Sequence, residues 1–449
     1  MQSFDIDKTD IHKIKQALEG DEQELLLLVQ DYHASEIAIL FESIPLEAQK
    51  RIINLLPVDV ASEIISEMSY EAHPEELLID LEPEKRQEIV EELDYDDATD
   101  IISQMHEDDQ QEILEEMDKE DAVNIRNLMT YAEDSAGGLM NTEVIKVGAE
   151  MTKKQAIDEI ILQSEEIEEF YTIYVVDHQN VLQGIVSLKD IIKCKASAKI
   201  SDLVNSDFVY VKANTDQEEV ADLISQYNLT SIPVVDVNMK LLGRVTFDDV
   251  IDVMEEENTE DILKFSGVSE DEELSGNWVE AVKSRLPWLI LNLGTAFLAS
   301  SVIRYFEPTV TKIVVLAGYM TIIAGMGGNA ATQALAVTIR RITLSDLTDH
   351  QAYRTVVKEF TVGLINGAVT GFVVFLFAYF YDHEPLLGIV VFIAMTGNLL
   401  IAGITGAGIP LILKRVGIDP AIASSIIITT FTDVFGFLLL LGLASKLLL

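Results

Sequence analysis

The sequence is poor in cysteine and, over its first 280 residues, poor in basic side chains. Cys194 is the only cysteine among 449 residues, which excludes an internal disulfide and fits a reducing compartment. Residues 281–449 hold 8 acids and 11 bases, so the 76 acids and 31 bases of the whole chain leave residues 1–280 with 68 acids, 20 bases and a net charge of −48. So acidic a segment repels nucleic acid and anionic lipid and attracts cations.

The first residues also lack the apolar core of a signal peptide, since they read MQSFDIDKTDIHKIKQ. We therefore expect the N-terminal half of the chain to stay in the cytoplasm. The sequence contains no nucleophile–base set and no phosphate-binding loop, so an enzyme is disfavoured.

Residues 1–137 have almost no strand pattern and repeat themselves. The segments LEPEKRQEIVEEL and MHEDDQQEILEEM, which begin at Leu81 and Met105, align at an offset of 24 residues. Each unit opens on an acid or Pro-Glu and continues with an apolar residue every three or four positions, which is typical of a short helix. The pattern predicts an all-α superhelical domain whose units bury their apolar faces on each other.

Residues 138–255 hold a second repeat, with copy one at 138–199 and copy two at 200–255. The segment LMNTEVIKV from Leu139 matches LVNSDFVYV from Leu203, and IYVVDHQNVLQGIVSLKDII matches IPVVDVNMKLLGRVTFDDVI. Each copy reads as strand, helix, strand, strand, helix. This order, repeated twice and ending on Gly-x-x-Ser/Thr-x-x-Asp, resembles a pair of cystathionine β-synthase (CBS) domains and implies an α/β fold.

The end of that motif binds adenine nucleotides in CBS domains, where the hydroxyl contacts phosphate and the Asp contacts ribose. A hydroxyl at a helix start, beside free backbone N–H groups, is also an anion site on physical grounds. Copy one offers Ser187, Lys189 and Asp190, so we expect a nucleotide such as ATP there. In copy two, Asp248 replaces the lysine and would repel phosphate. Plain N-capping by the hydroxyl is the alternative, and for copy two it is equally favoured. The motif positions are Gly184, Ser187 and Asp190 in copy one, and Gly243, Thr246 and Asp249 in copy two.

Acidic residues crowd the segment that follows, from Asp248 to Asp261. Apolar residues interleave with them, so we expect a helix that leads from copy two into a connecting helix at 256–280. Crowded carboxylates repel one another and raise each other's pKa values unless a cation sits among them. Oxygen-rich sites that retain water suit magnesium or calcium. A solvated acidic linker is the alternative.

Five hydrophobic runs follow in the predicted membrane domain, 281–449, each long enough to cross a bilayer. Basic residues in the connections after the second and fourth runs, such as Arg340, Arg341 and Arg415, outnumber Arg304 and Lys312 on the other side. The positive-inside rule therefore puts the N-terminus in the cytoplasm and the C-terminus outside. The runs are roughly 286–305, 313–338, 357–381, 386–412 and 420–446.

The last run contains one ionisable group between Ile422 and Leu443, the carboxyl of Asp433. A charge at mid-membrane costs roughly 2.5–3.5 kcal/mol on insertion scales, so such an acid is seldom there without a use. Helical spacing places Ser425, Thr429 and Asp433 on one face. We expect no second acid within the spans, so two copies of the chain are needed to neutralise a divalent cation. A protonated or hydrogen-bonded structural Asp is the alternative.

Glycine runs at 325–328 and 403–408 permit close helix contact or an unwound backbone that lines a cavity. Close packing is the commoner explanation of glycine alone. Asn329 and Asn398 lie beside these runs and favour a polar pathway.

The whole order of domains resembles the MgtE-type magnesium channels. The most specific segments are GRVTFDDVIDVMEEENTEDI, the Gly-Gly-Asn at 327–329 and KRVGIDPAIAS with TDVFGF. The resemblance implies a homodimer in the cell membrane with the pore on its two-fold axis, closed by cytoplasmic magnesium and tuned by ATP. It assigns Asp433 as the pore acid, with Asn329, Ser425 and Thr429 lining the pore. The regulatory magnesium ligands that it implies are Glu218, Asp249, Asp252, Glu257, Glu260 and Asp261.

The chain departs from the family pattern at two positions on the pore helices. Ala331 stands where the family commonly has glycine, and Ile426 where it often has proline. Both changes stiffen or straighten the helices assigned to the pore, so they bear on ion selectivity and gating. A transporter of manganese, cobalt or zinc is one rival, disfavoured because no Cys or His falls in a pore position. A sodium- or proton-coupled carrier that uses Asp433 is the other.

Overall fold

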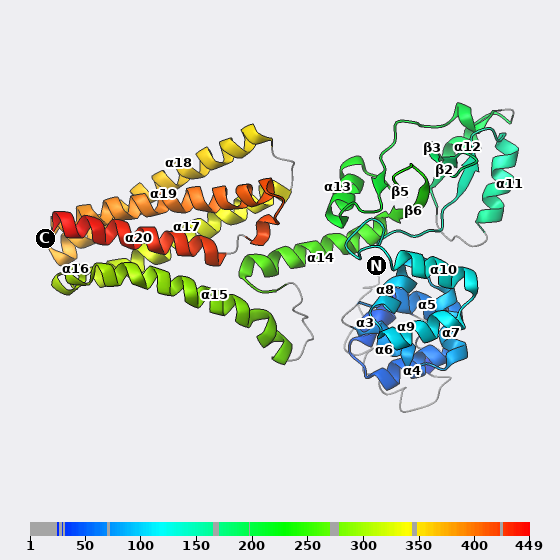
Figure 1. The fold of residues 1–449 in the computed structure, drawn as a ribbon, viewed down its shortest axis with the longest axis horizontal. Coiled ribbons are helices and arrows are strands. Elements are labelled where there is room, and N and C mark those ends of the chain that lie inside the picture. Colours follow the sequence, from blue (N-terminus) through cyan, green and yellow to red (C-terminus); the bar gives the residue numbers. More distant parts are fainter. Residues whose placement is uncertain are drawn as a thin grey trace. The chain divides into compact units, whose positions relative to one another are not determined.

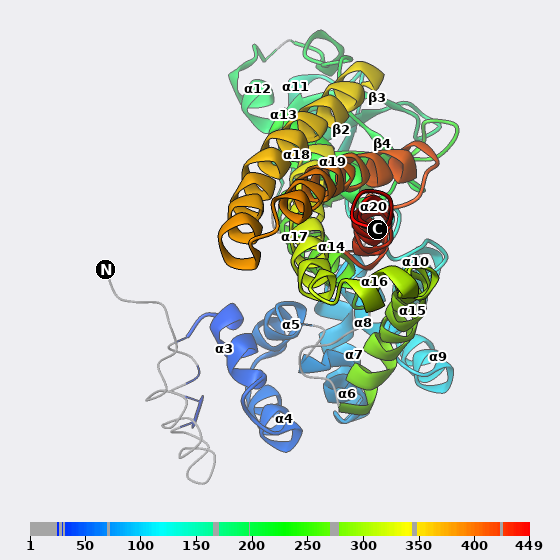
Figure 2. The ribbon, with the colours of Figure 1, turned by 90° about the vertical axis from the view of Figure 1, so that its left-hand side faces the viewer.

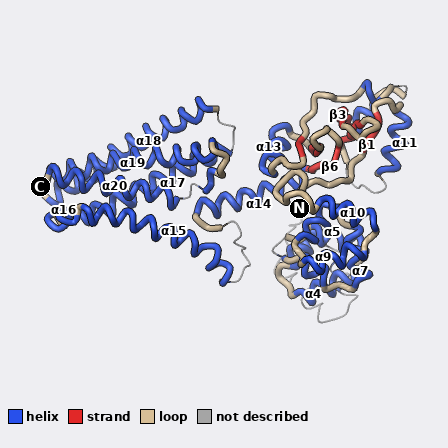
Figure 3. The backbone as a smooth tube through the Cα atoms, viewed as in Figure 1, coloured by secondary structure: helices blue, strands red, loops and turns tan. Residues whose placement is uncertain are grey.

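The computed structural model describes residues 25–26, 29, 32–69, 72–164, 170–196, 198–269, 278–343, 348–422 and 425–449. The chain forms two compact units, Met1–Glu257 and Asn258–Leu449, which are described one at a time. Figure 3 shows that the strands of the described residues belong to one part of the first unit, and the remaining regular elements are helices.

The first unit opens with a stack of short helices (Figure 1, blue to cyan), as the repeat predicts. Equivalent positions of successive repeats are buried, for example Ile89 in α7 and Ile113 in α9. The Arg86 guanidinium of α7 joins the two repeats by donating to Glu112 Oε1 at 2.9 Å and to Glu116 Oε2 at 2.7 Å. The helices are α3 (Ala34–Phe41), α4 (Leu46–Leu55), α5 (Val58–Ser66), α6 (Pro74–Ile79), α7 (Pro83–Glu92), α8 (Tyr95–Ser103), α9 (Glu107–Glu116) and α10 (Lys119–Leu128).

The predicted CBS pair follows as two three-stranded sheets with the expected order of elements. In each sheet the first strand pairs parallel with the second, and the second and third form an antiparallel hairpin. Tyr174 and Ser231 link the copies through a 3.0 Å hydrogen bond between their hydroxyls. Copy one contains β1 (Lys146–Gly148), α11 (Lys153–Gln163), β2 (Thr172–Val176), β3 (Leu182–Ser187) and α12 (Leu188–Lys193). Copy two contains β4 (Val211–Lys212), α13 (Gln217–Tyr227), β5 (Ser231–Val235), β6 (Leu241–Thr246) and α14 (Phe247–Ser266).

The glycine of each CBS motif is required by packing. A Cβ atom on Gly184 would lie 2.6 Å from the Asn205 carbonyl oxygen, and one on Gly243 would lie 2.5 Å from that of Asn141. Both contacts are with backbone, which cannot move aside cheaply, so any side chain larger than hydrogen would displace the neighbouring segment.

Helix α14 continues from copy two into the predicted connecting segment without a break. Its first turns are anchored by Val250 and Val253, which share a hydrophobic core with Leu128 of α10 and Val220 of α13. The rest of the predicted connecting segment includes residues 270–277, which lie outside the described residues.

The second unit contains the five long apolar helices that the sequence predicts, each long enough to cross a membrane. Helix α19 packs against α17, α18 and α20, as the end-on view of Figure 2 shows. By contrast, only 6% of the most apolar stretch of α15 is buried. The elements are α15 (Trp278–Tyr305), the short α16 (Glu307–Lys312), α17 (Leu316–Thr343), α18 (Asp349–Phe377) with a π-helical end (Ala378–Asp382), α19 (Pro385–Arg415) and α20 (Ser425–Leu447).

Glycines bring α18 and α19 into close contact. A Cβ atom on Gly363 would lie 2.4 Å from the Leu399 carbonyl oxygen, and one on Gly403 would lie 2.4 Å from that of Glu359. Small residues that let helix backbones approach are the usual means of association inside a bilayer. Within the glycine run at 403–408, Gly403 therefore confirms the packing interpretation, whereas Gly408 has open space around it.

Candidate functional site

Asp433 lies in the middle of α20, one turn after Thr429, and both residues are half-buried. Among the described residues, Asp433 has no hydrogen-bond or ion-pair partner, whereas the Thr429 hydroxyl donates to the Ile426 carbonyl oxygen at 3.2 Å. Ser425 begins α20, but its side chain lies outside the described residues. An unpaired carboxyl in an apolar helix is costly, so this face of α20 is suited to a cationic ligand.

The Gly-Gly-Asn stretch of α17 lies against this part of α20. A Cβ atom on Gly327 would lie 3.1 Å from Thr432 Cβ, and one on Gly328 would lie 3.3 Å from Thr429 Cγ2. Asn329, the next residue, is exposed. The structure therefore brings the segment that carries Asn329 to the segment that carries Thr429 and Asp433, although the two are about a hundred residues apart in the sequence.

Asn398 differs from the expectation of a polar pathway. It lies in α19 and is fully buried, and its Nδ2 donates to the Ile323 carbonyl oxygen of α17 at 3.0 Å. Its Oδ1 has no hydrogen-bond partner. The amide is therefore part of the packing between helices rather than a surface that an ion could reach.

The expectation that Asp433 is the only acid within the spans is wrong. Glu359 lies in α18, inside the third span, Asp349–Asp382. Its side chain is 7% exposed, and its Oε1 lies 3.3 Å from Nζ of the neighbouring Lys358, which is 57% exposed. Because that lysine balances its charge, Glu359 adds no net negative charge to the membrane domain.

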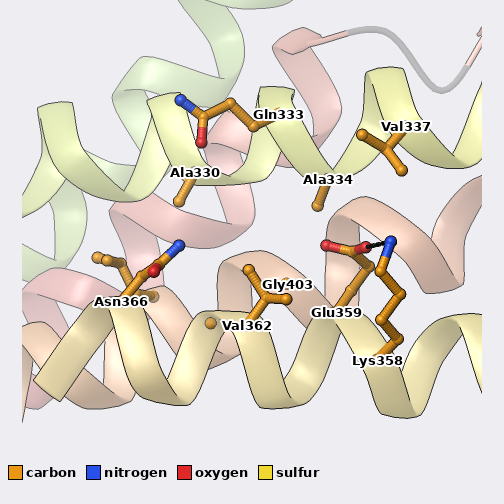
Figure 4. Close-up of a pocket in the computed structure, with 11 residues that line it drawn as sticks. Ala330, Gln333, Ala334, Val337, Lys358, Glu359, Val362, Asn366 and Gly403 are labelled. Carbon is orange, nitrogen blue, oxygen red and sulfur yellow. Dashed lines mark ion pairs between the residues drawn. The ribbon is translucent and has the colours of Figure 1, made fainter.

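Glu359 forms one wall of a cavity of about 230 Å³ between α17, α18 and α19 (Figure 4). Gln333 and Asn366 carry amide groups at its edge, and both side chains are exposed. Lys358 lines the cavity beside Glu359, and the remaining lining is small or aliphatic: Ala330, Ala334, Val337, Val362, Gly363, Leu399 and Gly403.

The predicted regulatory acids make three different sets of contacts. Asp249 and Asp252, in the first turns of α14, lie beside acids of the helical domain. Glu257 accepts a 2.7 Å hydrogen bond from Gln217 Nε2, and Glu218 is the next residue on α13. In the second unit, Glu260 pairs with Lys264, whose Nζ also lies 3.1 Å from Asp419 Oδ2, and Asp261 follows on the same helix.

The acids around Asp249 form the densest negative cluster. Burial and then the neighbouring charges of Asp97 and Asp249 raise the pKa of Asp96 well above its usual 3.8. Burial likewise raises the pKa of Asp97, followed by the charges of Asp94 and Asp249. We call Asp94, Asp96, Asp97, Asp249 and Asp252 the acidic cluster.

The pKa values of the two cluster members on α14, Asp249 and Asp252, are also raised. Burial is the largest cause of the raised pKa of Asp249, and the hydrogen bond from the Thr246 hydroxyl opposes it. Burial and then the charge of Glu67 raise the pKa of Asp252. Like charges that share a buried site disfavour each other's ionisation, and a bound cation would relieve that cost.

The sequence does not predict that the helical domain contributes carboxylates to the acidic cluster. Asp96 and Asp97 belong to the repeat, which predicts only helix starts, and their approach to Asp249 results from tertiary packing. No three Asp, Glu, His or Cys side chains in the described ranges are arranged to hold a metal ion. The acidic cluster within one chain is therefore a concentration of negative charge and not a finished coordination sphere.

In copy one of the CBS pair, the predicted nucleotide residues contact each other. The Ser187 hydroxyl accepts from the Asp190 backbone N–H at 3.1 Å and donates to Asp190 Oδ2 at 2.7 Å, while Lys189 is exposed. In copy two, Thr246 makes the equivalent hydrogen bond to Asp249. The Ser187 hydroxyl acts as an N-cap here, and in both copies a nucleotide would have to replace the contact between hydroxyl and carboxylate.

Five long apolar helices, one of which carries an unpaired acid, follow a helical domain and a CBS pair, and this combination is that of a multi-pass membrane transport protein. Three family models match the chain: the MgtE divalent cation transporter at 320–443, the MgtE intracellular N domain at 32–134 and the CBS domain at 136–197 and 200–256.

The chain is 34% identical to the magnesium transporter MgtE of Thermus thermophilus over 434 residues, which are 96% of each protein. It is 32% identical to the magnesium transporter MgtE of Bacillus subtilis over 95% of this chain and 94% of that protein. A solved cytosolic domain of the Mg²⁺ channel MgtE in complex with ATP is 34% identical and superimposes with a TM-score of 0.52, covering 54% of this chain and 99% of its own length.

This chain belongs to the MgtE family. Membership in a family of transporters confirms the expectation that it is not an enzyme, and it confirms the predicted fold class: an all-α N-terminal domain, an α/β CBS pair and five apolar helices.

Proposed function

We propose that this chain is a magnesium channel of the cell membrane, formed by two copies around a shared pore. The observation that carries the proposal is Asp433, an unpaired carboxyl on an apolar helix, beside the Gly-Gly-Asn stretch of α17. Relatives that match nearly the whole chain are magnesium transporters.

Charge balance supports the homodimer. One carboxylate cannot neutralise a divalent ion, and the buried acid of the third span, Glu359, is balanced by Lys358. Two copies of Asp433 across an axis supply two negative charges. Magnesium gives up its water reluctantly, so Asn329, Ser425 and Thr429 contact the hydration shell rather than the metal.

Regulation follows from the acidic cluster. Cytoplasmic magnesium binds among these carboxylates and at the acids of α13 and α14, and it closes the pore. Because the described residues of one chain form no complete metal site, the ions are held through retained water or shared with the second copy. The regulatory set remains Glu218, Asp249, Asp252, Glu257, Glu260 and Asp261, to which we add Asp96 and Asp97.

Adenine nucleotide binds copy one through Ser187, Lys189 and Asp190. The relative whose cytosolic domain was solved with ATP supports this assignment. The ammonium of Lys189 attracts phosphate, whereas Asp248 at the equivalent place in copy two repels it. In this arrangement the N-terminal domains are cytoplasmic and the C-terminus lies outside.

The test is magnesium flux into liposomes that contain the purified protein. Asp433→Ala and Asp433→Asn should abolish flux without loss of the dimer, since both remove the charge and the second keeps the shape. Glu307→Gln, which neutralises an exposed acid on α16, is the matched control and should transport normally. Wild-type flux through a well-folded Asp433→Ala dimer would refute the pore assignment.

Competition and gradient experiments separate the rivals. Manganese, cobalt or zinc that is carried in preference to magnesium would identify a transporter of another divalent cation. Flux that depends on a sodium or proton gradient would identify a coupled carrier.

A further inference from the structure

Asn398 occupies an unusual position for a polar side chain. It is fully buried in α19, between α17 and α20, and its amide nitrogen donates to the Ile323 carbonyl oxygen at 3.0 Å. The amide oxygen has no hydrogen-bond partner. Burying an amide with one side unsatisfied is unfavourable, so an apolar residue would serve better if packing alone were required.

Two glycines make room for this amide on the neighbouring helices. A Cβ atom on Gly327 of α17 would lie 2.3 Å from Asn398 Nδ2. A Cβ atom on Gly436 of α20 would lie 2.9 Å from the same nitrogen and 3.1 Å from Oδ1. The amide therefore lies directly against the bare backbones of both helices, and its size sets how closely they approach it.

Both glycines belong to the segments that carry the proposed pore residues. Gly327 precedes Asn329 by two residues, and Gly436 follows Asp433 by three. Thr432, the neighbour of Asp433, is also fully buried and lies against Gly327. A displacement of Asn398 would therefore move both segments, although Asn398 itself does not face the pore.

We propose that Asn398 is a positioning residue for ion selectivity, which fixes the spacing of α17 and α20 behind Asn329 and Asp433. The inference rests on the proposed function. Recognition of a hydrated ion requires its contacts to be held within about 0.5 Å, by side chains that are themselves locked by packing and hydrogen bonds. Asn398 donates a hydrogen bond to α17 and packs closely against α20.

The experiment compares the flux of magnesium with that of calcium and manganese in liposomes. Asn398→Leu keeps the approximate size and removes the hydrogen bond, and Gly436→Ala keeps the amide and displaces α20 from it. Each should lower the ratio of magnesium flux to calcium or manganese flux by about tenfold, the usual scale for loss of a residue that supports metal ligands.

A double variant provides the rescue. Asn398→Ala removes the amide and frees the space that the new methyl group of Gly436→Ala needs, so the combination should recover part of the selectivity lost in Gly436→Ala. Thr396→Val is the matched control, because this threonine lies on the same helix and donates only to the Phe392 carbonyl of that helix, at 2.8 Å. It should select ions as the wild type does.

The outcomes separate the two proposals. If wild-type protein does not carry magnesium, the proposed function fails. If wild-type protein selects magnesium and the Asn398→Leu and Gly436→Ala dimers transport with unchanged ion ratios, the positioning role is refuted. Should Asn398→Leu fail to fold, Gly436→Ala and the double variant decide the question alone.

Discussion

Acidification should replace magnesium in holding α8 of the helical domain against the start of α14. The members of the acidic cluster named above whose pKa values are raised are Asp96, Asp97, Asp249 and Asp252. A carboxyl whose pKa is raised by packing binds its proton more tightly in the packed state than in the unpacked one. The contribution of these groups is therefore fully present below the ordinary pKa of 3.8 and is lost as pH rises through the raised values.

The size of the effect follows from the number of protons taken up. Each proton that is bound on packing changes the free energy of packing α8 against α14 by about 1.4 kcal/mol per pH unit. This holds between the pKa of the group in the unpacked state and its raised pKa in the packed state. If Asp96 and Asp97, whose pKa values are raised well above normal, both titrate, one pH unit is worth about 2.7 kcal/mol, or about a hundredfold in the packing equilibrium. Magnesium removes the same repulsion without a proton, so the two effects should not add.

Limited proteolysis of the whole protein in detergent measures this packing. At fixed potassium and without magnesium, cleavage between the helical domain and the CBS pair should slow as pH falls, and magnesium should protect at neutral pH. Asp97→Asn should flatten the pH dependence, whereas Asp108→Asn, at an exposed position in α9, should not. Cleavage that is independent of pH without magnesium would contradict the reasoning.

Three further predictions concern other parts of the chain. Calorimetry should find one nucleotide site per chain, which is lost in Ser187→Ala and retained in Thr246→Ala; two equal sites would contradict this. Gly403→Ala should lower the stability of the membrane domain in a detergent melt by about 1–3 kcal/mol, because the new methyl group meets the Glu359 carbonyl oxygen. Lys264→Met should raise the magnesium concentration that halves the current in patch recordings, because it breaks the link from α14 to Asp419, and an unchanged midpoint would exclude that link from gating.

The sequence predicts the parts of this fold that depend on local periodicity. Apolar spacing identifies the short helices of residues 32–134, the internal match of the CBS copies identifies their shared order of elements, and run length identifies the five apolar helices. Such patterns are repeated over many residues, so a single irregular position does not obscure them.

The features that the sequence does not predict depend on contacts between distant segments. Asp96 and Asp97 resemble any acidic helix start until α14 brings Asp249 beside them. The sequence contains Glu359 within the third apolar run. Its place in the wall of a cavity, and the balance of its charge by Lys358, follow only from the structure. The full burial of Asn398 depends on three helices at once, and no spacing rule within one helix could predict it.

The two departures from the family pattern lie opposite glycines. Ala331 of α17 is fully buried, and a Cβ atom on Gly406 of α19 would lie 2.6 Å from its carbonyl oxygen. Ile426 of α20 faces Gly267, whose φ of +76° suits glycine and whose Cβ atom would lie 2.8 Å from Ile426 Cδ1. At both positions a glycine backbone from another segment meets the residue: Gly406 at the Ala331 carbonyl oxygen, and Gly267 at the Ile426 side chain. A methyl group on Gly406 would press on the backbone of α17, so this glycine lets α17 and α19 approach closely.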